Sequence, residues 1–279
     1  MRAPLSPGSG VRRHQITPLV VVLGLASAGC GKPACGDGET TCAVEGGSYL
    51  ALLPPDGAEG PLPLALLLHG YSSSAEGILG KADLAEVFGA AGFLLVAPRG
   101  IDATWVLPGS PEAEDGGGRD DMAFLDAVVA DVDQRWSVDR RLVGGFSHGS
   151  AAANVYACGG STSWDALLSV SGTFWEPMPD RCAAALPVRH SHGTADQTWP
   201  QEGRRFSPAV KQGDVWEGMA VWAATAGCAA APIEERRGPT TCTVWPGCAL
   251  ELCLHDGVHE WPEGEAARQL AWFDDLPAG

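Results

Sequence analysis

The sequence predicts an α/β domain with a parallel-rich central sheet and helices on both faces. Short apolar runs such as residues 64–68 and 93–97 are typical of strands buried on both faces of a parallel sheet. They alternate along the chain with segments of helical apolar spacing, as βαβ units do. No repeat and no change of composition marks a second domain, so residues 48–279 are expected to form one domain.

Each element is predicted from its local pattern. A strand is expected where apolar residues run together between turn residues, and a helix where they recur every three or four positions. In chain order, the expected strands are 48–53, 64–68, 93–97, the run at Leu142-Val143, 166–170, 187–191 and 250–255. The expected helices are 81–91, 120–136, the alanine-rich segment after Ser147, 215–226 and 265–273. The Gly-, Pro- and acid-rich stretch 101–119 is expected to be a surface loop.

The amino terminus has the pattern of an export signal. Arg12 and Arg13 precede a short apolar run, and small residues then lead to Cys30. We expect residues 1–29 to be a signal peptide and 30–47 a loose tether. The small residues before Cys30 resemble a bacterial lipoprotein signal, which would make Cys30 the lipidated residue; cleavage nearby by an ordinary signal peptidase is the alternative. The protein is therefore expected to be membrane-anchored through that lipid, or secreted or periplasmic.

The cysteine count supports export, because eight cysteines remain after Cys30, and an even number in an exported chain suggests disulfides. Cys35 and Cys42 are expected to close a small local loop, and Cys158 is placed to meet Cys182. The pairing among the remaining four is left open: Cys228, Cys242, Cys248 and Cys253.

The formal net charge of −16 argues against nucleic acid or an anionic membrane surface as the main partner, since both require a basic face. A soluble monomer is expected, with membrane contact only through the lipid anchor. The spacing of cysteines and histidines does not match a zinc site.

The chain is organised around Gly145-Phe146-Ser147-His148-Gly149, a G-x-S-x-G sequence between an apolar run and a helix-forming segment. A serine on such a tight turn is exposed, and the flanking glycines let neighbouring backbone approach. The following helix directs its N-terminal N–H groups toward a reacting carbonyl. This context predicts a nucleophile elbow with Ser147 as the nucleophile.

The α/β-hydrolase fold places the acid and then the base after such a serine. Asp196 follows the end of strand 187–191 in a glycine-containing turn and is the predicted acid, ahead of Asp165 and Asp180. His259 lies in the loop after the last strand and is the predicted base, whereas His255 on that strand is expected to be structural. The pair His190 and His192 at a strand end is a weak metal candidate because no third ligand is evident.

Two backbone N–H groups are predicted to form an oxyanion hole. One belongs to His148, directly after the nucleophile. The other is expected from the loop after His69-Gly70, with Tyr71 as the first candidate and Ser72 as the second. Trp175, Trp199 and Trp261 are candidates for the substrate-binding wall, although each could also be core packing.

Taken together, these motifs resemble exported polyhydroxybutyrate depolymerases and feruloyl esterase-like α/β-hydrolases. The resemblance covers roughly residues 45–275. It rests on Leu68-His69-Gly70, Val138-Asp139-Arg140-Arg141, the elbow, His192-Gly193-Thr194-Ala195-Asp196 and His259-Glu260-Trp261-Pro262, with Asp120-Asp121 also fitting. The sequence departs from the family at His148, where asparagine is usual, and at Tyr71 and Ser72, where glycine-rich residues are usual.

The resemblance implies an esterase with Ser147, Asp196 and His259 as its triad and no metal or organic cofactor. The implied substrate is a polyester or a plant or polysaccharide-linked ester, such as a feruloyl or acetyl ester. No long insertion precedes the acid, so no large lid is expected. The alternatives are another hydrolase of the same fold (acetyl xylan esterase, cutinase-like enzyme or peptidase) or a non-catalytic surface lipoprotein.

Overall fold

The computed structural model describes Met1 and residues 35–57, 60–81 and 83–276. The predicted signal segment, apart from Met1, and Cys30 lie outside these residues. Ala34–Gly279 forms one compact unit built on a ten-stranded sheet. Among the described helices, none is both long and apolar enough to span a bilayer.

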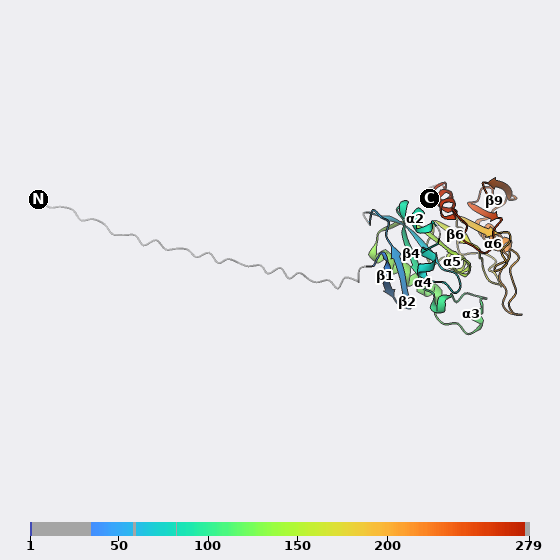
Figure 1. Ribbon diagram of the computed structural model, residues 1–279, viewed down its shortest axis with the longest axis horizontal. Coiled ribbons are helices and arrows are strands. Elements are labelled where there is room, and N and C mark those ends of the chain that lie inside the picture. The colour runs from blue at the N-terminus through green and yellow to red at the C-terminus, as the bar shows by residue number, and fades with distance from the viewer. Residues whose placement is uncertain (2–34, 58–59, 82, 277–279) are drawn as a thin grey trace. The chain divides into compact units, whose positions relative to one another are not determined.

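The sheet has the strand order β1-β2-β4-β3-β5-β6-β7-β10-β9-β8, with β1 and β2 at one edge and β9 near the other (Figure 1). The strands from β4 to β10 in this order are parallel neighbours, and the outer strands pair antiparallel. Their bounds are β1 Asp37–Val44, β2 Gly47–Leu52, β3 Leu62–Leu68, β4 Leu94–Pro98, β5 Val138–Phe146, β6 Ala166–Val170, β7 Val188–Gly193, β8 Ile233–Arg237, β9 Thr240–Trp245 and β10 Leu250–His255.

Two hydrophobic clusters cover the two faces of the sheet, because side chains alternate along a strand. In β3, Leu64, Leu66 and Leu68 belong to one cluster, and Ala65 and Leu67 to the other. Helices α4, α5 and α6 contribute to the first cluster, and α1, α2 and α7 to the second. Their bounds are α1 Ala75–Leu79, α2 Leu84–Ala90, α4 Asp121–Arg135, α5 His148–Gly159, α6 Val215–Ala226 and α7 Glu265–Asp274.

The predicted parallel core is confirmed. Strand 166–170, helix 215–226 and strand 250–255 have the expected bounds, and the other predicted elements differ by a few residues at their ends. Both faces of the sheet carry helices, as the alternation of apolar runs and helical segments predicts.

The tether prediction is wrong for the residues that the structure describes. Residues 37–44 form β1, an edge strand that pairs antiparallel with β2. Only Cys42 is fully buried in this strand, so it lacks the alternating apolar pattern by which strands are recognised. The disulfide between Cys35 and Cys42 fastens the strand locally, as expected.

The prediction of a surface loop for residues 101–119 is also wrong in part. The stretch contains a 3-10 turn at Ile101–Ala103 and helix α3 at Pro111–Glu114. Trp105, Leu107 and Ser110 are completely buried within it. Its Gly and Pro content conceals these inward-facing residues, of which Trp105 and Leu107 belong to the first hydrophobic cluster.

The structure resolves the cysteine pairing that the spacing leaves open. Cys158 pairs with Cys182, as predicted, and Cys228 pairs with Cys248. Cys242 pairs with Cys253, its direct cross-strand neighbour in the antiparallel β9–β10 pair. The register between β9 and β10 brings these two cysteines together, and the sequence pattern predicts β10 but not β8 or β9.

Candidate active site

Ser147 occupies the turn between β5 and α5. Its backbone φ of 56° and ψ of −124° lie in a region that residues other than glycine rarely adopt. The flanking glycines permit this turn: a Cβ on Gly145 would lie 2.4 Å from the Gly149 carbonyl oxygen, and a Cβ on Gly149 would lie 2.1 Å from that of Leu68. The turn therefore holds Ser147 at the N-terminus of a twelve-residue helix, where the helix dipole favours developing negative charge.

The three predicted triad residues meet at the carboxyl edge of the sheet. The Ser147 Oγ lies 2.8 Å from His259 Nε2, and His259 Nδ1 lies 2.7 Å from Asp196 Oδ2. A carboxylate only accepts hydrogen bonds, so Nδ1 carries the proton and Nε2 is free to accept one from the serine. This is the geometry of a serine nucleophile with its base and orienting acid.

Asp196 is fixed by its own loop. The Asp196 side chain is fully buried, and its Oδ1 accepts the backbone N–H groups of Thr198 and Trp199, each at 2.8 Å. Burial pushes the pKa of Asp196 upward, but the hydrogen bonds from His259 and Trp199 outweigh burial and leave the pKa below its usual value. The carboxyl group is therefore ionised at neutral pH and oriented toward His259.

The ring of His259 also packs against Phe146, the residue before the nucleophile. The two ring centroids are 5.0 Å apart, and Lys81 Nζ lies 4.2 Å from the centroid of the Phe146 ring. Phe146 thus limits the positions that the His259 ring can take. No sequence pattern predicts a role for Phe146, apart from its position directly before the nucleophile in the elbow motif.

The predicted oxyanion donors lie beside Ser147. Gly70 lies against the nucleophile, since a Cβ there would come within 3.3 Å of the Ser147 Cβ. Ser72 is excluded as a donor because its N–H donates to the Ala103 carbonyl at 2.8 Å. No acceptor in the described part of the chain contacts the N–H groups of Tyr71 and His148. Both N–H groups therefore remain available to an oxyanion.

The loop that carries Tyr71 is anchored by His69 and Trp105. His69 Nε2 accepts the N–H of Gly100 at 3.0 Å, and the Trp105 indole donates to the His69 carbonyl at 2.8 Å. The Trp105 carbonyl in turn accepts a hydrogen bond from His148 Nε2 at 2.8 Å. Trp105 is a functional-site residue that the sequence analysis misses, because it lies in the stretch predicted to be a surface loop.

The His148 side chain is buried and has both ring nitrogens occupied. Its Nε2 donates to the Trp105 carbonyl, and its Nδ1 accepts the Trp175 indole N–H at 3.2 Å. Burial lowers the pKa of His148, with partial compensation from Glu112, whose carboxylate lies 3.6 Å from Nε2. His148 thus joins the wall of the site to the oxyanion loop as a neutral imidazole.

A cleft of about 690 Å³ extends from Ser147 and is lined by side chains of the 101–119 stretch and of residues 198–212. Trp175 and Trp199 line it, as predicted, although both are more than nine-tenths buried. Trp261 does not line it. The Trp261 side chain lies in the second hydrophobic cluster with Ala266 and Phe273. The prediction for Trp261 is therefore corrected.

Two acceptor atoms in the wall of this cleft lack a hydrogen-bond donor among the described residues. They are Glu112 Oε2 and Gln212 Oε1, both buried. The other Glu112 oxygen accepts the Thr104 hydroxyl at 2.8 Å. Neither residue carries a motif by which the sequence could reveal it.

Five of the described histidines have a pKa below the usual value, and burial is the main cause in each. The group consists of His69, His148, His190, His192 and His255. We refer to this group as the neutral histidines. His255 accepts the N–H of Gly257 at 3.1 Å and thereby orders the start of the loop that carries His259.

No protein-family model matches the chain. A curated relative described as "Putative esterase NocK", from Nocardia uniformis subsp. tsuyamanensis, is 29% identical over 227 residues. The match covers 72% of this chain and 66% of the relative, so the chain spans slightly less than two thirds of that protein.

Solved structures of similar shape are enzymes with this arrangement of sheet and helices. An acetyl xylan esterase from Aspergillus awamori has a TM-score of 0.62 at 15% identity, covering 81% of this chain and 93% of that one. Esterase PE8 has a TM-score of 0.58 at 18% identity, covering 81% and 97%. A phospholipase/carboxylesterase from Dyadobacter fermentans has a TM-score of 0.53 at 14% identity, covering 83% and 97%. The chain has the α/β-hydrolase fold. At these identities the likeness establishes the fold alone.

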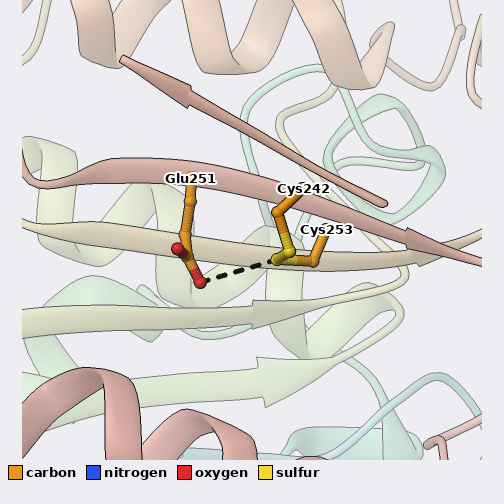
Figure 2. Close-up of side chains that lie close together, drawn as sticks. All are labelled: Cys242, Glu251 and Cys253. Carbon is orange, nitrogen blue, oxygen red and sulfur yellow. Dashed lines mark hydrogen bonds between the residues drawn. A yellow bond between two sulfur atoms is a disulfide. The ribbon is translucent and has the colours of Figure 1, made fainter. Parts of the chain in front are cut away.

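A second cluster of potential ligand atoms lies on β9 and β10, away from the elbow. Ligand atoms of Cys242, Glu251 and Cys253 lie within 4.8 Å of one another, and Figure 2 shows that the two sulfur atoms form a disulfide. Glu251 is paired with the guanidinium groups of Arg189 and Arg237. The cluster is thus a cross-strand disulfide beside a buried ion-pair network.

Proposed function

We propose that this protein is a carboxylic ester hydrolase in which Ser147 is the nucleophile, His259 the general base and Asp196 the residue that orients it. The observation that carries the proposal is the continuous hydrogen-bonded array Ser147–His259–Asp196, whose Ser147 lines a cleft. The esterase named among the curated relatives and the esterases among the structural neighbours support the same reaction class.

The reaction proceeds in two halves through an acyl-enzyme. His259 Nε2 takes the proton of the Ser147 hydroxyl as the oxygen attacks the ester carbonyl, and Asp196 stabilises the resulting imidazolium. The N–H groups of His148 and Tyr71 donate to the oxyanion. His259 then gives its proton to the departing alkoxide, which leaves as the alcohol. Water activated by His259 next releases the acid from Ser147. This mechanism requires no metal or organic cofactor.

The ester is proposed to be one that is linked to a plant polysaccharide, such as an acetyl or feruloyl ester, in preference to a polyester. The exposed carboxylates of Asp102 and Asp115, which line the cleft and can accept hydrogen bonds from a substrate, support this choice. A polysaccharide offers hydroxyl donors close to the scissile bond, whereas the repeating unit of a polyester offers only acceptors. Kinetics with acetylated xylan, methyl ferulate and polyhydroxybutyrate test the choice, and faster release from the polyester would reject it.

The reaction class is tested by comparing wild-type protein with Ser147→Ala on p-nitrophenyl acetate. The proposal predicts a loss of kcat of at least about 10³-fold in the variant. Ser161→Ala, which alters an exposed serine, is the matched control and should retain full activity. Equal rates for wild type and Ser147→Ala would favour the non-catalytic surface protein instead. Cleavage of peptide amides at rates above those of esters would favour a peptidase.

Export and lipidation at Cys30 are a separate proposal, supported by the pattern of residues 1–30. The chain is proposed to be membrane-anchored only through that lipid, or otherwise secreted or periplasmic, and to be a monomer. Intact-mass analysis of protein expressed with its native leader tests the anchor. A diacylglyceryl adduct on Cys30 as the first residue is expected, and an unmodified N-terminus elsewhere would reject lipidation. Sedimentation of the same sample tests the monomer.

A further inference from the structure

His190 and His192, the pair that the sequence analysis considers as a weak metal candidate, lie next to each other inside β7. They are 2% and 0% exposed. Their rings are stacked with centroids 5.3 Å apart and an interplanar angle of 13°. His190 Nε2 lies 3.0 Å from His192 Nδ1, so the two imidazoles are hydrogen-bonded to each other.

One end of this pair reaches the loop of the triad acid. His192 Nε2 lies 2.8 Å from the carbonyl oxygen of Trp199 and 3.5 Å from Asp196 Oδ2. The N–H of the same Trp199 donates to Asp196 Oδ1. His192 therefore contacts both the carboxylate and the peptide segment that orients it.

The other end reaches the helix that carries the nucleophile. His190 Nδ1 lies 2.7 Å from the Ser169 hydroxyl, which is itself 2.6 Å from the hydroxyl of Ser150. Ser150 lies in the first turn of α5, three residues after Ser147. Asn154, one turn further along α5, donates to Ser169 at 3.1 Å.

The carbonyl acceptor at one end of this hydrogen-bonded series fixes the direction of its protons. Burial lowers the pKa of both imidazoles, so each ring is neutral and carries one N–H. The Trp199 carbonyl can only accept, so the proton of His192 is on Nε2 and its Nδ1 must accept from His190 Nε2. His190 Nδ1 then accepts the hydroxyl proton of Ser169. The Ser169 hydroxyl also lies 3.0 Å from the Gly172 carbonyl, to which Ser150 donates at 2.7 Å. The ring N–H groups of His190 and His192 both point toward the acid loop.

We propose that Ser169, His190 and His192 are positioning residues that hold the Asp196 loop in register with helix α5, so that His259 stays within hydrogen-bond distance of Ser147. The proposal rests on the proposed function, because it concerns the geometry of the same triad. The aligned bond dipoles also direct their positive ends toward the buried carboxylate. These residues act through Asp196 and do not contact the reacting atoms.

The first test reads the proton positions directly in the wild-type protein. Nitrogen-15 NMR of histidine-labelled protein distinguishes the two neutral tautomers of each ring. The expected result is the Nε2–H tautomer for both His190 and His192, and the Nδ1–H tautomer for His259. The Nδ1–H tautomer in His192 or a charged imidazolium at either position would overturn the proposal without any need for a variant.

The second test uses His190→Phe, which keeps a planar ring in the stack but removes both hydrogen bonds. With p-nitrophenyl acetate we expect kcat to fall roughly tenfold with KM changed less than about twofold, since small displacements of catalytic groups affect the chemical step. His190→Gln keeps a donor toward His192 and should recover at least about a third of the wild-type kcat.

The matched control is Tyr156→Phe, also on α5. It removes a buried hydroxyl that is hydrogen-bonded to Asp126 and Thr162, near the opposite end of the helix from Ser147. Its kcat should remain within about twofold of wild type although its stability falls. Unchanged kcat in His190→Phe, or an equal loss in Tyr156→Phe, would reject the positioning role. Failure of the proposed function would give a different result, because Ser147→Ala would then be as active as the wild-type protein.

Discussion

Replacing Asp196 with asparagine should abolish most of the activity while preserving the shape of the site. The Oδ1 position of Asp196 accepts two backbone N–H groups, so the carbonyl oxygen of the new amide is held there. The amide nitrogen then occupies the position 2.7 Å from His259 Nδ1 and donates to it. His259 must carry its proton on Nε2, which faces Ser147 and can no longer accept the serine proton.

The magnitude follows from this reversal of the tautomer. The same substitution in a serine protease triad, a worked case for another protein, lowers kcat about 10⁴-fold. That factor corresponds to roughly 5 kcal/mol of activation free energy. We expect a loss of the same order here, because the carboxylate also contacts Nδ1 of the base and is buried.

The assay is the initial rate of p-nitrophenyl acetate hydrolysis at neutral pH, with folding of each variant checked by circular dichroism. Asp180→Asn provides the control, since Asp180 is exposed and was the less favoured candidate for the acid. More than a tenth of wild-type kcat in Asp196→Asn would refute the role of Asp196. So would an equal loss in the Asp180→Asn variant.

Three further predictions concern the oxyanion loop, acid stability and a disulfide. Gly70→Ala should lower kcat about tenfold or more, because the new Cβ would contact Ser147 Cβ and the Phe146 carbonyl at 3.3 Å. In the control Gly159→Ala the new Cβ meets no atom within 4 Å, so kcat should not change. Equal kcat values for the two variants would contradict this prediction. In the folded protein the pKa of each of the neutral histidines lies below the unfolded value of about 6.5. The unfolded chain therefore binds more protons than the folded protein below that pH, and the free energy of unfolding falls as pH drops from 7 to 5. Each contributes at most about 1.4 kcal/mol per pH unit, and a urea midpoint independent of pH in this range would contradict the assignment. Replacing both Cys158 and Cys182 with alanine opens a loop of 24 residues. The free energy of unfolding, measured by urea titration, should fall by about 3 kcal/mol, and KM should not change. An unchanged urea midpoint would show that this disulfide adds no stability.

The central part of the fold and the three triad positions follow from local patterns in the sequence. The elbow needs glycines at fixed places, and the acid and base follow strands whose carboxyl ends meet at one edge of a parallel sheet. Chain order then limits the choice to Asp196 and His259, which the structure brings to Ser147. These inferences depend on residues that are close in sequence to a strand end.

The features that the sequence does not reveal have a weak apolar pattern or depend on side-chain packing that no local pattern predicts. β1 and β8 are edge strands with few buried side chains, so their apolar pattern is weak. Trp105 is buried because a loop folds under His69, which no local pattern predicts. Trp261 is predicted to line the cleft, but it packs in the core, because a position two residues after His259 does not fix the direction of its side chain.

The reactivity of Ser147 is the most direct test of the account. Incubation with a fluorophosphonate, followed by peptide mass spectrometry, measures which residue forms the covalent adduct. The account predicts one adduct per chain, on Ser147, and its near-complete loss in His259→Ala because the serine then has no base. An adduct on another residue, or none on Ser147 in the folded wild-type protein, would contradict the assignment of Ser147 as the nucleophile.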